Sequence, residues 1–132
     1  MEKFRAIIEQ ATDGGYSVRC EEIAGAFGYG MDEEEAKDDF LDVIAEQCEY
    51  YTEKHGHAPV WESVEFEYVY DLRAFFALFP FINVSGFAHE VGINASLMRQ
   101  YSKGIAFASE RQRDNIERGL RRVVNRLSAV KF

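Results

Sequence analysis

A short run of cationic and hydrogen-bonding residues between Asn94 and Lys103 has side chains suited to reading DNA. In the major groove, arginine pairs well with guanine, glutamine with adenine, and serine with bases or phosphates. Acidic residues are absent from this segment although they crowd the first half of the chain. A solvated polar face is the alternative interpretation. We predict that six residues face DNA: Asn94, Ala95, Ser96, Arg99, Gln100 and Lys103.

Two short helices must hold these residues, and their pattern predicts a helix-turn-helix. Asn83 can cap a helix that runs to about Val91, and Asn94 can cap a second one that reaches Lys103. Such a pair joined by a short turn containing a glycine is typical of this motif. A small residue fits where the helices cross, and a glycine fits where the turn demands a positive φ. The predicted scaffold is Phe87, Ala88, Val91, Gly92, Ile93, Met98 and Tyr101.

Two further helices are predicted in this half. One is short and apolar, from Leu72 to Phe79, and Pro80 stops it. The other begins after Ser109 as N-cap, and its predicted buried stripe is Ile116, Leu120, Val123 and Leu127. Its arginines could reach phosphates, form a soluble face or pair with acidic residues. The apolar tail, residues 128–132, could add a strand or a dimer contact.

The charge of the chain is divided unevenly between its halves. The 132 residues carry a formal net charge of -8. Residues 1–71 hold 19 acidic and 5 basic residues, a net charge of -14, whereas residues 72–132 hold 4 acidic and 10 basic residues, a net charge of +6. Such asymmetry indicates two different partners, one anionic and one basic. The acidic average therefore does not exclude DNA as a partner of the second half.

The acidic half is predicted to be an α+β unit with the element order β-β-β-α-β. Alternating apolar residues predict strands at 3–11 and 16–20 around a turn, and a glycine-dotted third strand lies within 24–30. Asp32 caps a long helix that ends at Gly56, with a buried face formed by Ala36, Phe40, Ile44, Cys48 and Tyr51. A last strand is predicted within 60–70.

Other kinds of chemistry are less well supported by the residues. The acids between Asp32 and Asp42 suggest a metal or nuclease site, but consecutive acids on one helix diverge and mostly cap and solvate it. His55 and His57 have no carboxylate or cysteine at ligand spacing. The two cysteines form no C-x-x-C pair. We expect no metal or other cofactor, no membrane segment and a cytoplasmic location.

The order of elements, together with "INVSGFAHEVGINASLMRQYSKGIAFASERQ", resembles the HicB family of antitoxins in the form that has a C-terminal helix-turn-helix of the Cro/repressor kind. The resemblance covers nearly the whole chain and is strongest from Tyr70 to Gln112. It implies a partial ribonuclease-H-like fold in residues 1–71 and an all-α DNA-binding domain in residues 72–132. A ribonuclease H would place an essential aspartate at the centre of the first strand, where this chain has Ala6 and Ile8. The resemblance thus implies a fold without catalysis.

In that family, the first domain binds a small basic toxin that cleaves messenger RNA, and the second binds the operator of the toxin and antitoxin genes. We therefore expect an antitoxin that neutralises a HicA-like toxin and represses its own operon. Because helix-turn-helix proteins usually bind paired half-sites, a homodimer or higher oligomer is expected. The alternatives are a solitary transcriptional regulator or a protein-interaction module without a toxin partner.

Overall fold

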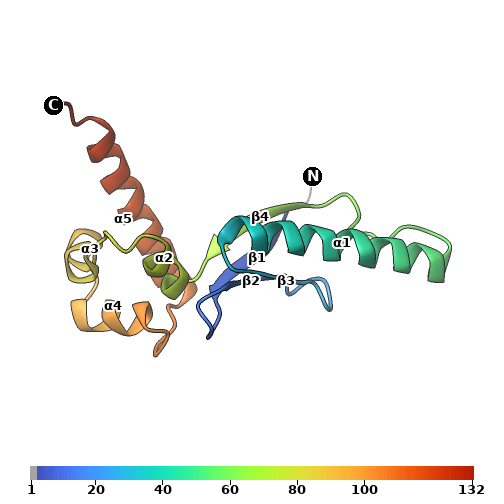
Figure 1. Ribbon diagram of the computed structural model, residues 1–132. Helices are drawn as coiled ribbons and strands as arrows, with labels where there is room; N and C mark the ends of the chain where they lie inside the picture. Colours follow the sequence, from blue (N-terminus) through green and yellow to red (C-terminus); the bar gives the residue numbers. More distant parts are fainter. Residues whose placement is uncertain (1–2) are drawn as a thin grey trace. The chain divides into compact units, whose positions relative to one another are not determined.

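The computed structural model of the chain describes residues 3–132 and consists of a four-stranded mixed sheet and five helices (Figure 1). The predicted α+β class is therefore confirmed. Two compact units are present, one extending to Ala74 and the other beginning at Phe75. The division falls three residues after the boundary predicted from the charge distribution. Within residues 3–132, no helix combines the length and apolar character needed to cross a bilayer.

The sheet of the first unit has the strand order β3-β2-β1-β4. Its first three strands form an antiparallel meander, and the fourth runs parallel to β1. Asp13 shapes the turn between β1 and β2, because its Oδ1 accepts a hydrogen bond of 3.0 Å from the Gly15 N–H. The strand bounds are Lys3–Gln10 for β1, Tyr16–Arg19 for β2, Phe27–Gly30 for β3 and Glu65–Tyr70 for β4.

The core of the first unit lies between the sheet and the long helix α1, Glu33–His55. The alternation along β1 places Ala6 and Ile8 on the covered face, where both side chains are fully buried. Phe40 of α1 is fully buried as well. A Cβ atom at Gly28 would lie only 2.4 Å from the Phe40 backbone nitrogen. Glycine at this position of β3 therefore lets the helix pack directly on the strand.

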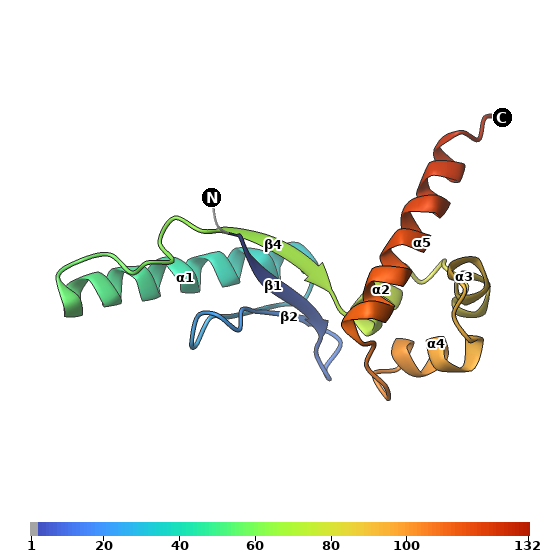
Figure 2. The same cartoon turned by 180° about the vertical axis from the view of Figure 1, so that it is seen from behind.

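Helix α1 begins and ends as predicted, but it is covered over only part of its length. Asp32 caps it by accepting a 2.8 Å hydrogen bond from the Glu35 N–H, and Gly56 ends it with φ 75°. The predicted buried face is wrong beyond Phe40, since Ile44, Cys48 and Tyr51 are only half-buried. The reason is length: 23 helical residues span about 35 Å, whereas a four-residue strand spans about 13 Å. Both views show α1 extending past the strands (Figures 1 and 2).

Strand β4 is shorter than predicted, because the residues just before it form turns. The Glu62 N–H donates to the Pro59 carbonyl at 3.1 Å, and Val60 is 94% exposed. The strand itself joins α1 through Phe66, whose ring meets that of Phe40 edge to face at 5.0 Å between centroids. The β4 edge of the sheet is thus held by both backbone pairing and aromatic packing.

Helix α2, Leu72–Leu78, continues across the division between the units, and three further helices follow it. Pro80 lies two residues after its end, close to the predicted stop. In the second unit, the rings of Phe75 and Phe76 pack on Phe87, with centroids 5.6 and 5.8 Å away. The remaining helices are α3, Val84–Val91, α4, Ala95–Ser102, and α5, Glu110–Ser128.

Helix α5 packs tightly on α3 near its middle and is exposed towards its C-terminus. Ser109 caps it by accepting a 3.2 Å hydrogen bond from the Gln112 N–H. Gly119 is buried, and a Cβ atom there would lie 2.4 Å from Val91 Cγ1. The predicted buried stripe holds at Ile116 but is wrong at Leu127, which is 65% exposed. Both views show why, since α5 runs on past α3 and α4 (Figures 1 and 2).

The tail of the chain does not form the additional strand that was one of its two predicted roles. Residues 129–132 belong to no helix or strand and are exposed, so the tail adds no strand to the sheet. Leu120 and Val123, by contrast, are half-buried and continue the stripe that begins at Ile116. Apolar periodicity therefore identified the packed side of α5 but not the point where its partner ends.

Candidate nucleic-acid interface

A turn of left-handed backbone at Gly92 joins α3 to α4. Gly92 has φ 76°, a value that glycine adopts without the steric penalty of a side chain. The following N–H, that of Ile93, donates to the Ala88 carbonyl at 2.9 Å. This bond closes the C-terminus of α3 in the manner of a Schellman motif, so the direction in which the chain leaves α3 is fixed.

Two asparagines define where these helices begin, as the sequence predicts. Asn83 Oδ1 accepts a 2.7 Å hydrogen bond from the Gly86 N–H, and Asn94 Oδ1 accepts one of 3.1 Å from the Leu97 N–H. Each cap satisfies an N–H group that has no partner inside its helix. Asn94 therefore uses its carbonyl oxygen within the protein, and its side-chain NH₂ group is the part that can donate to DNA.

The inner side of the helix pair is formed by most of the predicted scaffold residues. Ala88 and Met98 are fully buried, which agrees with a small residue where the helices cross. Ile93 was predicted to face inward and is only half-buried, because the turn carries it to the rim of the pair. Gly92 is exposed, as its role in the turn requires. The other buried members are Phe87, Val91 and Tyr101.

The outer side of α4 carries the residues predicted to face DNA. Ser96, Arg99 and Gln100 are all exposed and follow the i, i+3, i+4 spacing of one helix face. Lys103 is exposed at the C-cap, and Asn94 is exposed at the N-cap. Ala95 is half-buried, so it offers DNA only part of its methyl surface. The structure thus places hydrogen-bonding and cationic groups together along one side of a helix.

Ser85 belongs to this surface, although its sequence position did not identify it. Its Oγ accepts a 3.0 Å hydrogen bond from Arg99 Nη1, which links the first turn of α3 to α4. Both side chains are exposed. The only signal in the sequence is a hydroxyl two residues after the N-cap Asn83. That signal says nothing about which residue of another helix lies nearby.

Half of the arginines on α5 make contacts inside their own unit. Arg126 forms a 3.1 Å ion pair with Glu90 of α3, and Arg113 donates to the Ala108 carbonyl at 3.2 Å. Arg118 donates to Asn115 one turn earlier on the helix. Exposed ion pairs of this kind contribute about 0–1 kcal/mol. The remaining exposed arginines of α5 are Arg111, Arg121 and Arg122.

One side of α4 is therefore buried and the other is polar, cationic and exposed. No family model, curated protein or solved structure matches this chain. Support for a function consequently comes from the residues, their geometry and the distribution of charge.

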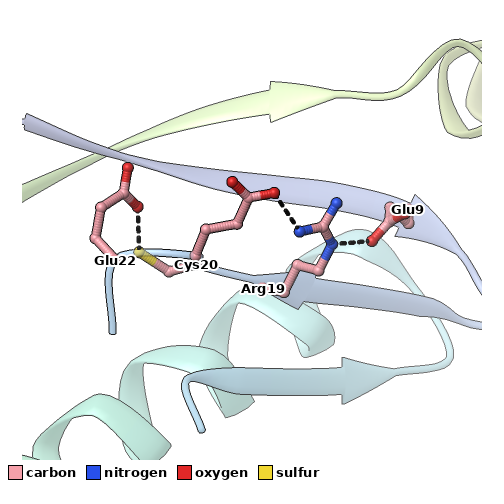
Figure 3. Close-up of polar contacts among 5 residues, drawn as sticks. Glu9, Arg19, Cys20 and Glu22 are labelled. Atoms are coloured by element: carbon pink, nitrogen blue, oxygen red, sulfur yellow. Dashed lines mark hydrogen bonds and ion pairs between the residues drawn. The ribbon is translucent and has the colours of Figure 1, made fainter. Parts of the chain in front are cut away.

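In the first unit, the side chains of Arg19 and Cys20 both donate hydrogen bonds to glutamates (Figure 3). Arg19 on β2 pairs with Glu9 at 2.6 Å and with Glu21 at 2.8 Å. Burial raises the pKa of the Cys20 thiol to about 11, and the neighbouring Glu22, which accepts its hydrogen bond at 3.2 Å, acts in the same direction. The thiol therefore stays protonated near neutral pH and is a poor nucleophile.

One acidic residue at the start of α1, Glu33, contacts the edge strand β4. Glu33 accepts a hydrogen bond from the Tyr70 hydroxyl and pairs with Lys37 Nζ at 3.0 Å. Burial raises the pKa of Glu33, but the contacts with Tyr70 and Lys37 outweigh it and leave the pKa below its usual value. Lys37 Nζ also lies 4.8 Å from the centre of the Tyr68 ring. Within residues 3–132, no three His, Cys, Asp or Glu side chains gather in a way that could hold a metal ion.

Proposed function

We propose that this chain is a HicB-type antitoxin that represses its own operon and neutralises a small basic toxin that cleaves messenger RNA. In this proposal α3 and α4 form a helix-turn-helix, and α4 is the recognition helix. The observation that carries the proposal is the two-sided character of α4. Met98 and Tyr101 are buried on one side, while Ser96, Arg99 and Gln100 are exposed on the other.

The dimensions and chemistry of α4 suit the major groove. An α-helix with its side chains is about 10–12 Å wide, and the groove of B-DNA is about 12 Å wide. Arg99 can bind guanine through two donors, and Gln100 can bind adenine through its amide. Lys103, one turn further along, can contact a phosphate. A basic net charge in this half favours approach to a polyanion.

The first unit supports the toxin-binding part of the proposal through its charge and through the apolar residues at the centre of β1. A net charge of -14 over residues 1–71 steers a basic partner towards this unit. Ala6 and Ile8 are buried at the centre of β1, so no carboxylate stands there. In this interpretation the unit is a ribonuclease-H-like fold that binds protein, requires no cofactor and acts in the cytoplasm beside its nucleic-acid targets.

The proposed DNA-binding form is a homodimer. Helix-turn-helix proteins place two recognition helices in successive major grooves, about 34–36 Å apart. One α4 helix offers only a few base-reading side chains, so two copies are needed to specify an operator. Analytical ultracentrifugation of the full chain tests this point, and a monomer at micromolar concentration would contradict it.

Alanine substitution on the exposed side of α4 tests DNA recognition. Arg99→Ala and Gln100→Ala should each weaken binding to operator DNA about 5- to 150-fold, the range expected for a lost bidentate base contact. Electrophoretic mobility shift at fixed salt measures this effect. Arg5→Ala is the matched control, because Arg5 is an exposed arginine on β1 of the first unit. Unchanged binding by both α4 variants would refute the assignment of α4.

A second candidate function is that of a protein-interaction module without a toxin. The observation in its favour is the uncovered part of α1, where Leu41 is 46% and Tyr50 65% exposed among acidic residues. Co-expression with any small basic protein encoded beside this chain separates the two functions. An antitoxin should relieve the growth arrest that such a protein causes. Persistent arrest without specific DNA binding would favour the interaction module, whereas persistent arrest with specific DNA binding would favour a solitary regulator.

A further inference from the structure

Ser85 and Arg99 form a contact between the two helices of the candidate nucleic-acid interface. Arg99 Nη1 donates to Ser85 Oγ at 3.0 Å, and the two residues are 14 positions apart in the chain. Ser85 lies in the first turn of α3, and Arg99 lies on the exposed side of α4. The bond thus joins α3, which is not the proposed recognition helix, to Arg99, the side chain of α4 best suited to binding a base.

This bond has little to contribute to folding. Both side chains are exposed, and water can replace either partner. The helix pair is already fixed by its buried scaffold, in which Ala88 and Met98 are inaccessible to solvent. What the bond does restrict is the orientation of a long side chain that would otherwise sample many rotamers.

Restricting Arg99 before it binds has a consequence for recognition. Immobilising a flexible side chain at an interface opposes binding, and a side chain held in advance has less freedom to lose. A guanidinium group has five N–H donors, of which the Ser85 contact uses one on Nη1. The Nε and Nη2 donors lie along another edge of the planar group. That edge can still make the paired hydrogen bonds that select guanine.

We infer that Ser85 is a positioning residue for base recognition, which holds the Arg99 guanidinium in the orientation that reads a guanine. This inference rests on the proposed function, because it requires Arg99 to contact a base. Ser85 itself need not touch DNA. Its contribution is to the preference for one base pair over another, rather than to the overall attraction between protein and DNA.

The test begins with a pool of random-sequence duplexes, from which the full-length wild-type chain selects its preferred site. Affinities are then measured for that duplex and for duplexes that carry single base-pair changes. Arg99→Ala should abolish the preference at one G·C position. Ser85→Ala should reduce the same preference about three- to tenfold, the effect expected when one side chain must be ordered on binding. Preference at the other positions should stay unchanged.

Three comparisons separate positioning from a general structural effect. Ser85→Thr keeps a hydroxyl and should restore most of the preference. Adding Ser85→Ala to Arg99→Ala should cause no further loss, since the two residues act through one contact. Ser128→Ala is the matched control and should behave as wild type, because the Ser128 hydroxyl donates only to the Asn125 carbonyl of its own helix.

The possible outcomes distinguish the inference from the function on which it rests. Failure to select any sequence from the pool would overturn both the proposed function and the role of Ser85. A selected sequence that requires Arg99 but is read equally well by Ser85→Ala would overturn the positioning role alone. Loss of preference at every position in Ser85→Ala would also overturn it, since positioning of one side chain affects one contact.

Discussion

Replacing Gly119 by alanine should destabilise the second unit, although the same change in most helix interiors is stabilising. Alanine is favoured over glycine inside a helix by about 0.5–1 kcal/mol. At this position, however, the new Cβ would lie 2.4 Å from Val91 Cγ1 and 3.0 Å from Val91 Cα. The second of these atoms is backbone, so relief requires α3 to move away from α5.

The expected size follows from the two opposing effects. Overpacking of a close contact typically destabilises by about 1–3 kcal/mol, so subtracting the helix-propensity gain leaves a net loss of up to about 2.5 kcal/mol. Because the contact at Gly119 is as short as 2.4 Å, we expect a net loss of about 1–2 kcal/mol within that range. For a unit of this size, that loss lowers the melting temperature by roughly 4–16 °C. Because α3 supports α4, the same movement should also weaken the proposed binding to DNA.

Hydrogen exchange and thermal unfolding of the full chain measure this effect. Amides of α3 and α5 should exchange faster in Gly119→Ala than in wild type. Gly86→Ala is the matched control, since Gly86 also lies in a helix but the atoms nearest to a Cβ there belong to the Asn83 side chain, the first of them at 3.3 Å. Its stability should stay the same or rise by about 0.5 kcal/mol.

Val91→Ala provides a second check on the same contact. It removes Cγ1 but keeps a Cβ atom, which would still lie 2.6 Å from the alanine Cβ at position 119. Relief is therefore partial, and the double variant should lose less stability than the sum of the two single variants. If Gly119→Ala melts at or above the wild-type temperature while Gly86→Ala behaves as stated, α3 and α5 do not approach each other this closely.

Three further predictions concern single side chains. Tyr70→Phe removes the hydroxyl that donates to Glu33 and should lower stability at pH 7 by up to about 1 kcal/mol. The hydrogen bond from Tyr70 and the pairing with Lys37 lower the pKa of Glu33, so their contribution to stability is present above pH 4.5 and is lost as the pH falls through the lowered pKa. Urea titrations of Tyr70→Phe and wild type should therefore give converging unfolding free energies in acid. Burial and Glu22 raise the pKa of the Cys20 thiol to about 11. A maleimide at pH 8 should therefore modify Cys48 first and Cys20 only in denaturant. Equal rates of modification in the native protein would contradict this. Asn94→Ala should lower the unfolding free energy of the second unit by about 1 kcal/mol, whereas Asn94→Asp should keep the cap yet weaken DNA binding through its negative charge.

Helix boundaries were the part of the fold most fully predictable from the sequence. Asp32, Asn83, Asn94 and Ser109 all accept the hydrogen bond expected of an N-cap. Capping could be predicted because both partners lie within three residues of each other in the chain. The strands of the meander were predictable for a similar reason, since period-two alternation and a tight turn are local signals.

Features that depend on distant parts of the chain were not predictable. Apolar spacing identified the packed sides of α1 and α5, but Tyr51 is only half-buried and Leu127 is exposed because their partners end earlier. The same limit applies to the candidate interface. Spacing could place Arg99 on the outer side of α4, whereas its bond to Ser85 depends on the angle at which two helices cross.

The parallel pairing of β4 with β1 has a consequence for the order in which the chain folds. Register partners run from Lys3 with Glu65 to Ile8 with Tyr70, so the sheet closes only after more than sixty intervening residues have been made. The contacts in the second unit span shorter sequence separations, from Phe76 with Phe87 to Glu90 with Arg126, and contacts of lower separation form faster. During synthesis, β1 must therefore wait with one edge unpaired until β4 has left the ribosome. The segment between β1 and β4 is strongly negative, and this charge opposes association between unfinished chains while β1 is unpaired.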